Sequence, residues 1–252
     1  MPFQNTTPRA YLAPGVEGGW ASANPHASLL QPNTGDLSDA NAASWKAGSV
    51  APPIVGRFAF ADVVTGLVTS AHPGTGANFV EGSSGQPGRV RVGFLQRDQI
   101  ALITTWLAEY GTVVQPGTGV TLLNRGDVWA KFAAGAAVGS FVFASFADGS
   151  AIAGATSTAP TATGVTVTTV SGSPNLTAVA GGTLYPGQPV SGAGIPAGAY
   201  IVSVSGSTAV LSANATASAS GVAVTQTTGI LTPWRVVSLA AAGEIAKISV
   251  WG

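Results

Sequence analysis

Few side chains in this sequence could perform acid–base or metal chemistry. The chain has no cysteine and only two histidines, His26 and His72, each next to a proline in a segment typical of loops. The lack of cysteine removes thiolate nucleophiles, disulfides and zinc–cysteine sites. Asp36 and Asp39 could touch a cation, but the calcium-loop pattern around them is incomplete. We therefore expect that the protein is not an enzyme, and that it has no catalytic residue, no metal site and no cofactor.

Short motifs with a known chemical use are better explained as turns. Gly74-Thr75-Gly76 and Gly192-Ala193-Gly194 do not open a helix after a strand with an acidic residue downstream, so a phosphate-binding loop has little support. Arg125-Gly126-Asp127 is the tripeptide of some integrin ligands. Here it belongs to a predicted turn, 124–127, that enters a strand, and the turn alone accounts for Gly126.

Charge is unevenly distributed along the chain. The 252 residues carry ten basic and ten acidic side chains with a formal net charge of zero, which argues against nucleic-acid binding. All of these charges lie in residues 1–148 and 235–252, so residues 149–234 are uncharged. A break in composition of this kind marks the boundary of a module.

Membrane and targeting signals are not visible in the sequence. The first residues lack the basic and apolar regions of a signal peptide. Phe132–Ala147 is uncharged but shorter than the roughly 20 residues that span a bilayer, and it contains two glycines. We expect a protein made in the cytoplasm that does not enter a membrane.

Residues 1–50 are predicted to form an extended N-terminal arm. The segment is rich in Pro, Asn, Gly, Ala and Ser, and no period of 2 or 3.6 persists in it. Its isolated hydrophobic residues would suit anchors on a partner protein. An arm folded back on its own domain is an equally good explanation. The predicted partner-contact residues are Phe3, Tyr11, Leu12, Trp20, Leu29, Leu30 and Trp45.

The rest of the chain predicts an all-β fold. In residues 51–153, Ile54–Val64 and Arg89–Phe94 alternate as strands do, whereas Asp98–Tyr110 fits a helix or a strand equally well. Residues 154–230 contain short strands rich in Thr and Val, including a hairpin around Ser205-Gly206-Ser207. Residues 231–252 again contain tryptophan and charged residues, as residues 51–148 do. We therefore predict a β-barrel or sandwich-like base domain, 51–153 plus 231–252, interrupted by a small antiparallel β-sandwich, 154–230.

Several segments resemble structural cement proteins of tailed bacteriophages. They are the arm segment Trp20–Pro25, Val55–Ala59, Gly93–Arg97 with Ala101–Thr104, Gly126–Trp129 and the final Ala241–Gly252. The resemblance implies a capsid decoration protein on the outside of the virion. Its partners would be the major capsid protein and further copies of itself, with a trimer favoured.

The inserted segment is similar to small β modules of phage virion and fibre proteins, on the residues Gly187–Ile201 and Leu211–Thr216. This leaves an alternative function open, a tail-associated or surface adhesin that recognises glycans through residues 154–230. The aromatic residues that such a site would need are few there, Tyr185 and Tyr200.

Overall fold

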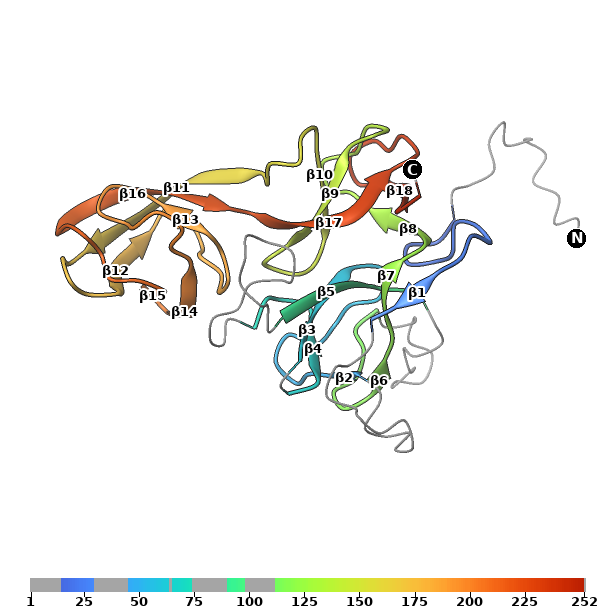
Figure 1. Ribbon diagram of the computed structural model, residues 1–252, viewed down its shortest axis with the longest axis horizontal. Helices are drawn as coiled ribbons and strands as arrows, with labels where there is room; N and C mark the ends of the chain where they lie inside the picture. The colour runs from blue at the N-terminus through green and yellow to red at the C-terminus, as the bar shows by residue number, and fades with distance from the viewer. Residues whose placement is uncertain (1–14, 30–44, 64, 74–89, 98–111, 252) are drawn as a thin grey trace, which may run out of the picture.

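The computed structural model describes residues 15–29, 45–63, 65–73, 90–97 and 112–251, which form strands β1 to β18 (Figure 1). No helix occurs among these residues, so the predicted all-β class is confirmed. The segment 98–110, predicted as helix or strand, lies outside the described residues.

A curled seven-stranded sheet makes up one half of the base. Its order is β1-β7-β5-β3-β4-β2-β6, and all neighbours are antiparallel except β2 and β4. Alternation explains the burial of both faces of β3: Phe58 and Phe60 enter the larger hydrophobic core, while Ala59 and Ala61 enter a second, smaller one. The strands are β1 Ala27–Ser28, β2 Trp45–Ala47, β3 Phe58–Asp62, β4 Leu67–Thr69, β5 Val90–Leu95, β6 Gly119–Val120 and β7 Leu122–Arg125.

A five-stranded antiparallel sheet makes up the other half of the base, in the order β10-β9-β17-β18-β8. A bridge between Phe132 and Ala151 brings its two edges together. The larger core lies between the two sheets, where Trp234 of β17 contacts the ring of Phe58 at 5.5 Å between ring centroids. The strands are β8 Asp127–Lys131, β9 Phe141–Ser145, β10 Ala151–Gly154, β17 Gly229–Val236 and β18 Ile245–Ser249.

Strands β11 to β16 form a separate curled sheet, which we call the inserted module. Its order is β13-β16-β11-β12-β15-β14, and a bridge between Pro189 and Tyr200 joins the two edge strands. This contact leaves little free strand edge. The predicted hairpin is present, with Ser205 opposite Thr208 and Gly206 at φ 56°. The strands are β11 Thr161–Thr169, β12 Asn175–Ala180, β13 Val190–Ser191, β14 Ile201–Ser205, β15 Thr208–Leu211 and β16 Ala219–Thr227.

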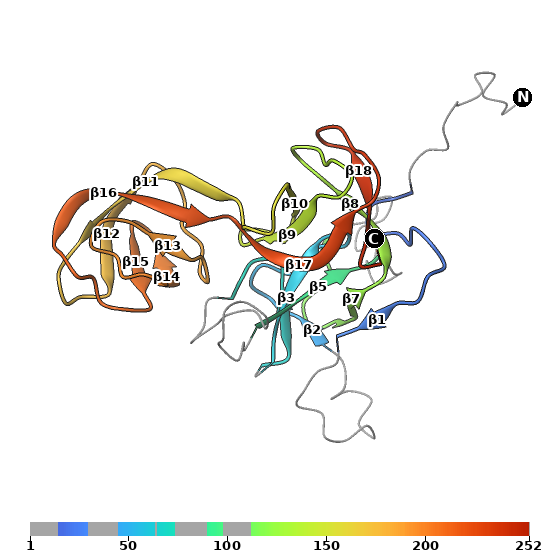
Figure 2. The ribbon, with the colours of Figure 1, turned by 45° about the horizontal axis from the view of Figure 1, so that its top comes forward.

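The inserted module and the base have separate hydrophobic cores. The core of the module draws only on residues between Val165 and Val224. Strands β11 and β16 connect it to the base, where the backbone N–H of Thr228 donates to the carbonyl of Pro160 at 2.8 Å. The module extends away from the two sheets along the long axis of the molecule (Figures 1 and 2). The predicted domain boundaries stay a prediction, and the separate cores are the observation that supports them.

Candidate docking surface

Residues 15–29 lie across the edges of both sheets of the base. The N–H of Gly18 donates to the carbonyl of Trp129 at 2.7 Å, and the N–H of Ala21 donates to the carbonyl of Asp127 at 2.9 Å. Further along, β1 pairs with β7. This part of the predicted arm therefore covers two strand edges that would otherwise be open to other chains. The arm folds back on its own domain here, which is one of the two alternatives that the sequence left open.

Asp127 is the side chain that holds this segment. Its Oδ2 accepts hydrogen bonds from Ser22 Oγ at 2.6 Å and from Asn24 Nδ2 at 2.8 Å, and it pairs with Lys247 Nζ at 3.0 Å. Burial raises the pKa of the Asp127 carboxyl, but the hydrogen bonds from Ser22, Ser249, Lys247 and Asn24 outweigh burial and lower the pKa to about 2. A buried carboxylate with several donors is stable only while those donors remain in place.

The Arg125-Gly126-Asp127 segment is not the predicted turn. Arg125 ends β7 and Asp127 begins β8, so Gly126 is a one-residue link through which the chain crosses from one sheet to the other. Its φ of 142° suits glycine. The side chain of Asp127 is 1% exposed, which excludes recognition of this tripeptide in the folded protein.

Trp20 and His26 cover Gly126 from outside. Their rings lie 4.4 Å apart between centroids, and a β-carbon on Gly126 would lie 3.3 Å from Cβ of His26 and 3.4 Å from Cζ3 of Trp20. Both side chains are nevertheless exposed, and Trp20 keeps 41% of its surface open. A larger residue at position 126 would push this pair outward.

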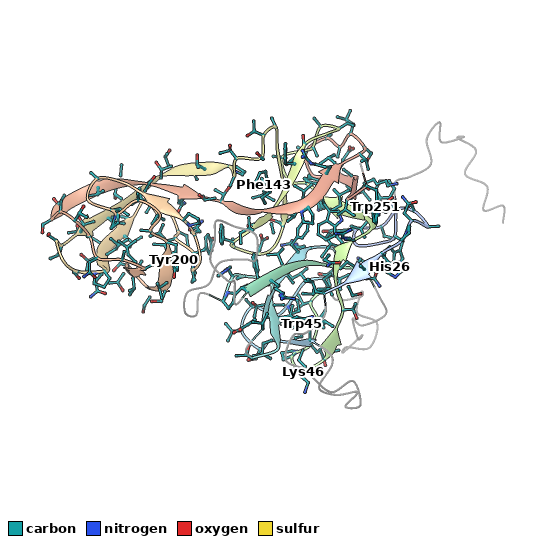
Figure 3. The ribbon with its side chains drawn as sticks, viewed as in Figure 1. His26, Trp45, Lys46, Phe143, Tyr200 and Trp251 are labelled. Atoms are coloured by element: carbon teal, nitrogen blue, oxygen red, sulfur yellow. The ribbon has the colours of Figure 1, made fainter. Side chains whose placement is uncertain are left out.

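Arg125 and Trp251 continue the same surface. The guanidinium carbon of Arg125 lies 6.0 Å from the centre of the Trp251 ring, at the range of a cation–π contact. Trp251 is 52% exposed. We call Trp20, His26, Arg125 and Trp251 the docking surface. His26 and Trp251 lie at the end of the base that is far from Tyr200 of the inserted module (Figure 3).

The contact residues predicted from the sequence lie in different parts of the structure. Trp20 lies on the docking surface, and Leu29 packs against the smaller core of the base. Trp45 is 2% exposed in that same core, and its Nε1 donates to the carbonyl of Leu29 at 2.9 Å. In this structure the Trp45 side chain is thus occupied within its own domain. Four of the predicted residues lie outside the described part of the chain: Phe3, Tyr11, Leu12 and Leu30. A partner contact by the set stays a prediction.

Sequence reasoning missed His26, Arg125 and Trp251 as members of one surface. Trp251 lies two residues beyond the end of β18, so no strand pattern predicts its exposure. Its meeting with Arg125 arises because β18 pairs with β8, which places Ser249 opposite Asp127. The pairing of β18 with β8 cannot be predicted from the residues near either strand in the sequence.

The titratable side chains of the described residues do not gather into a cluster of metal ligands. No group of three or more His, Asp or Glu side chains that could hold a metal ion occurs among them. His26 is exposed beside Trp20, whereas His72 is buried between the rings of Phe60 and Phe146. In the part of the chain that the structure describes, no helix has the length and apolar character needed to cross a membrane.

Comparison with known families identifies the chain. The sequence model of the XM1 gp53 minor capsid protein family matches residues 3–181. The chain belongs to this family. The match spans the predicted arm, both sheets of the base up to β10, and the first strands of the inserted module.

Membership in this family makes the chain a phage capsid protein with a structural role in the virion. The resemblance to phage capsid proteins that the sequence indicated is therefore confirmed at this level. No curated protein matches the chain, and no solved structure matches it.

Proposed function

We propose that the chain is a capsid cement protein, which binds the outside of the major capsid protein shell and stabilises it. The observation that carries the proposal is the position of the two exposed tryptophans among the described residues. Trp20 packs on His26, and His26 and Trp251 lie at the end of the base that is far from Tyr200 of the inserted module (Figure 3). Exposed tryptophan beside arginine is the composition that interface hot spots favour.

The distribution of charge suits such a role. Residues 149–234 are uncharged, so many copies displayed side by side on a shell would not repel one another through their inserted modules. A protein that binds the assembled shell and not its separate subunits stabilises the shell by mass action. The proposal includes self-association, with a trimer favoured by the resemblance to cement proteins, and it includes no nucleic acid or membrane partner.

Binding to shells tests the proposal. Shells of the same phage that lack this chain are incubated with the purified protein, and the bound fraction is measured by co-sedimentation. Electron microscopy of the decorated shells then shows whether added density lies outside. We expect saturable binding on the exterior and a higher melting temperature of the shell. Density inside the shell, or none at all, would contradict a cement role.

Tryptophan substitutions assign the binding to the docking surface. Trp20→Ala and Trp251→Ala should each weaken shell binding by about tenfold or more, as expected for truncated hot-spot residues. Leu239→Ala is the matched control, because Leu239 is 77% exposed and does not belong to the docking surface. Equal losses in all three variants would show that the docking surface has no special part in binding.

The alternative function, a glycan-binding adhesin acting through residues 154–230, has less support. Tyr185 and Tyr200 are the aromatic residues of this region before β17, and both are partly buried. A glycan platform needs an open aromatic face with polar groups beside it. Binding of the purified chain to a glycan array, unaffected by Trp20→Ala and Trp251→Ala, would favour this alternative over the cement role.

A further inference from the structure

We infer that the docking surface recognises an acidic partner surface, and that Arg125 is the group that binds a partner carboxylate. This inference rests on the proposed function, since it states the chemistry of the partner that the docking surface takes. Arg125 would add a specific ionic contact to a surface whose other side chains are aromatic rings.

The first reason is the charge balance of the docking surface. Arg125 is exposed, and no described carboxylate forms an ion pair with its guanidinium. The nearest acidic residue along the chain, Asp127, does not serve it, because its side chain is 1% exposed and forms its ion pair with Lys247 beneath the surface. Among the residues that the structure describes, the docking surface therefore presents one positive charge without an acidic partner.

Two further acidic side chains of the described base, Glu244 and Asp148, have partners elsewhere. Glu244 precedes β18 and Trp251 follows it, so the whole of that strand separates them. The carboxylate of Glu244 also accepts a hydrogen bond from the backbone of Ala241. Asp148 pairs with Arg57, away from Arg125. A partner that brings its own carboxylate would thus meet no competing acid from these groups.

The second reason is the way Arg125 is supported. Its guanidinium lies over the Trp251 ring, and the residue opposite it on β1 is Ala27, which has a small side chain. An indole below a guanidinium limits the positions of the planar fork while leaving its N–H groups available. Such a fork matches the two oxygens of a carboxylate, and charge-assisted bonds of this type are about twice as strong as neutral ones.

The third reason is the aromatic area beside the charge. Trp20 and His26 pack on each other next to Arg125, since His26 directly precedes β1 and Ala27 pairs with Arg125. When a partner covers these rings, water is removed around the guanidinium and the ionic contact becomes stronger. A neutral glycan or an apolar protein surface would use the rings equally well but would gain nothing from the charge.

Charge reversal at Arg125 tests the inference on stripped phage shells. In about 0.1 M salt, Arg125→Glu should weaken binding by about tenfold or more, because a like-charge contact replaces an attractive one. Arg125→Lys should retain part of the affinity, since it keeps the charge but loses the fork. Lys46→Glu is the matched control: Lys46 is exposed, carries the same charge change and lies at another part of the base (Figure 3). It should change binding by less than about twofold.

Two further measurements test the inference independently of the proposed function. Raising the salt should weaken binding of the natural chain and have less effect on Arg125→Glu. An immobilised oligo-glutamate peptide should capture the natural chain, and an oligo-glutamine peptide should not. A circular dichroism melt shows whether Arg125→Glu is folded, and Arg125→Gln replaces it if the protein is not.

The outcomes are distinct. If Trp20→Ala loses shell binding and Arg125→Glu does not, the docking surface is apolar and the inference is wrong, while the cement role stands. If the natural chain captures oligo-glutamate through Arg125 but does not bind shells, the cement role is wrong and the inference about chemistry stands.

Discussion

Gly187 in the inserted module lies directly against the imidazole of His72 in the base. A β-carbon on Gly187 would come within 2.4 Å of Nδ1 of His72. His72 is 3% exposed and packs against Phe60 and Phe146, with ring centroids 5.3 Å and 5.7 Å away. The base thus holds the imidazole in place, and the contact sets the position of the module in addition to the two strands that connect it.

Substitution of Gly187 should disturb the junction between module and base. Gly187→Ala meets the His72 ring and also requires φ 81°, which alanine adopts at a cost. We expect a loss of about 2–3 kcal/mol in the free energy of unfolding, measured by denaturant titration. Small-angle scattering should show a broader range of module positions.

Gly198→Ala is the matched control for this substitution. Gly198 has φ 76°, but a β-carbon there would meet nothing within 4 Å. It therefore carries the backbone cost alone, about 1 kcal/mol. Equal losses in the two variants would mean that the contact with His72 contributes nothing to stability.

Removal of the Asp127 charge should release residues 15–29 from the base. Asp127→Asn leaves Lys247 without its ionic partner and weakens the bonds to Ser22 and Asn24, so we expect a loss of about 3 kcal/mol. Limited proteolysis should cut the 15–29 segment faster in the variant. Asp148→Asn provides the comparison, because the Asp148 side chain is 40% exposed in its pair with Arg57 and should matter by less than about 1 kcal/mol. Unchanged proteolysis in Asp127→Asn would refute the anchoring role.

Acid should weaken the protein through the same carboxylate. The pKa of Asp127 is lowered to about 2 in the folded state from an ordinary value of 3.8. Its contribution to stability is therefore complete above pH 4 and is lost as the pH falls from about 4 to 2. This lowering of the pKa corresponds to about 2 to 3 kcal/mol of stability, at roughly 1.4 kcal/mol per pH unit.

Comparison with Asp127→Asn isolates this contribution. Other carboxyls also titrate: burial raises the pKa of Glu17 despite the nearby Arg57, Lys131 and Arg97, which gives the opposite trend with pH. The difference in unfolding free energy between the natural chain and the variant should shrink between pH 4 and 2. A constant difference over this range would show that Asp127 is not the titrating group.

Removal of the inserted module should leave the base folded. Replacing residues 156–227 with a short Gly/Ser linker keeps β10 and β17, both of which pair with β9. Because the module has its own core, the base loses no residue of its two hydrophobic clusters. We expect a cooperative melt and unchanged shell binding. An unfolded product would show that the module is an integral part of one domain.

Local features of the chain followed from local patterns. Alternation predicted the strand around Phe58 and Phe60, and the small residues at 205–207 predicted a tight hairpin. The uncharged residues 149–234 contain strands β11 to β16, which have their own core, together with β10 and most of β17 of the base. In each case the signal and the structure involve neighbouring residues, so the backbone geometry follows from residue type.

The predicted arm contains a buried strand, β2, that its sequence pattern does not predict. Composition placed Trp45 on an arm with little core, yet the pairing of β2 with β4 and β6, which puts Trp45 opposite Val120, brings it into the core of the base. A deletion of the whole segment 1–50 would therefore remove a core strand of the base. The sequence around Trp45 has no period that reveals this pairing, since a three-residue strand is too short to show one.

The amino-acid sequence by itself determined the all-β class, the uncharged stretch 149–234 and the scarcity of chemical groups, because these depend on composition and on contacts between near neighbours. Only the tertiary structure decided that Arg125 meets Trp251, that Asp127 holds Ser22 and Asn24, and that Gly187 faces His72. Such contacts depend on which strand edges pair and in what register. That choice is made by the packing of the whole core.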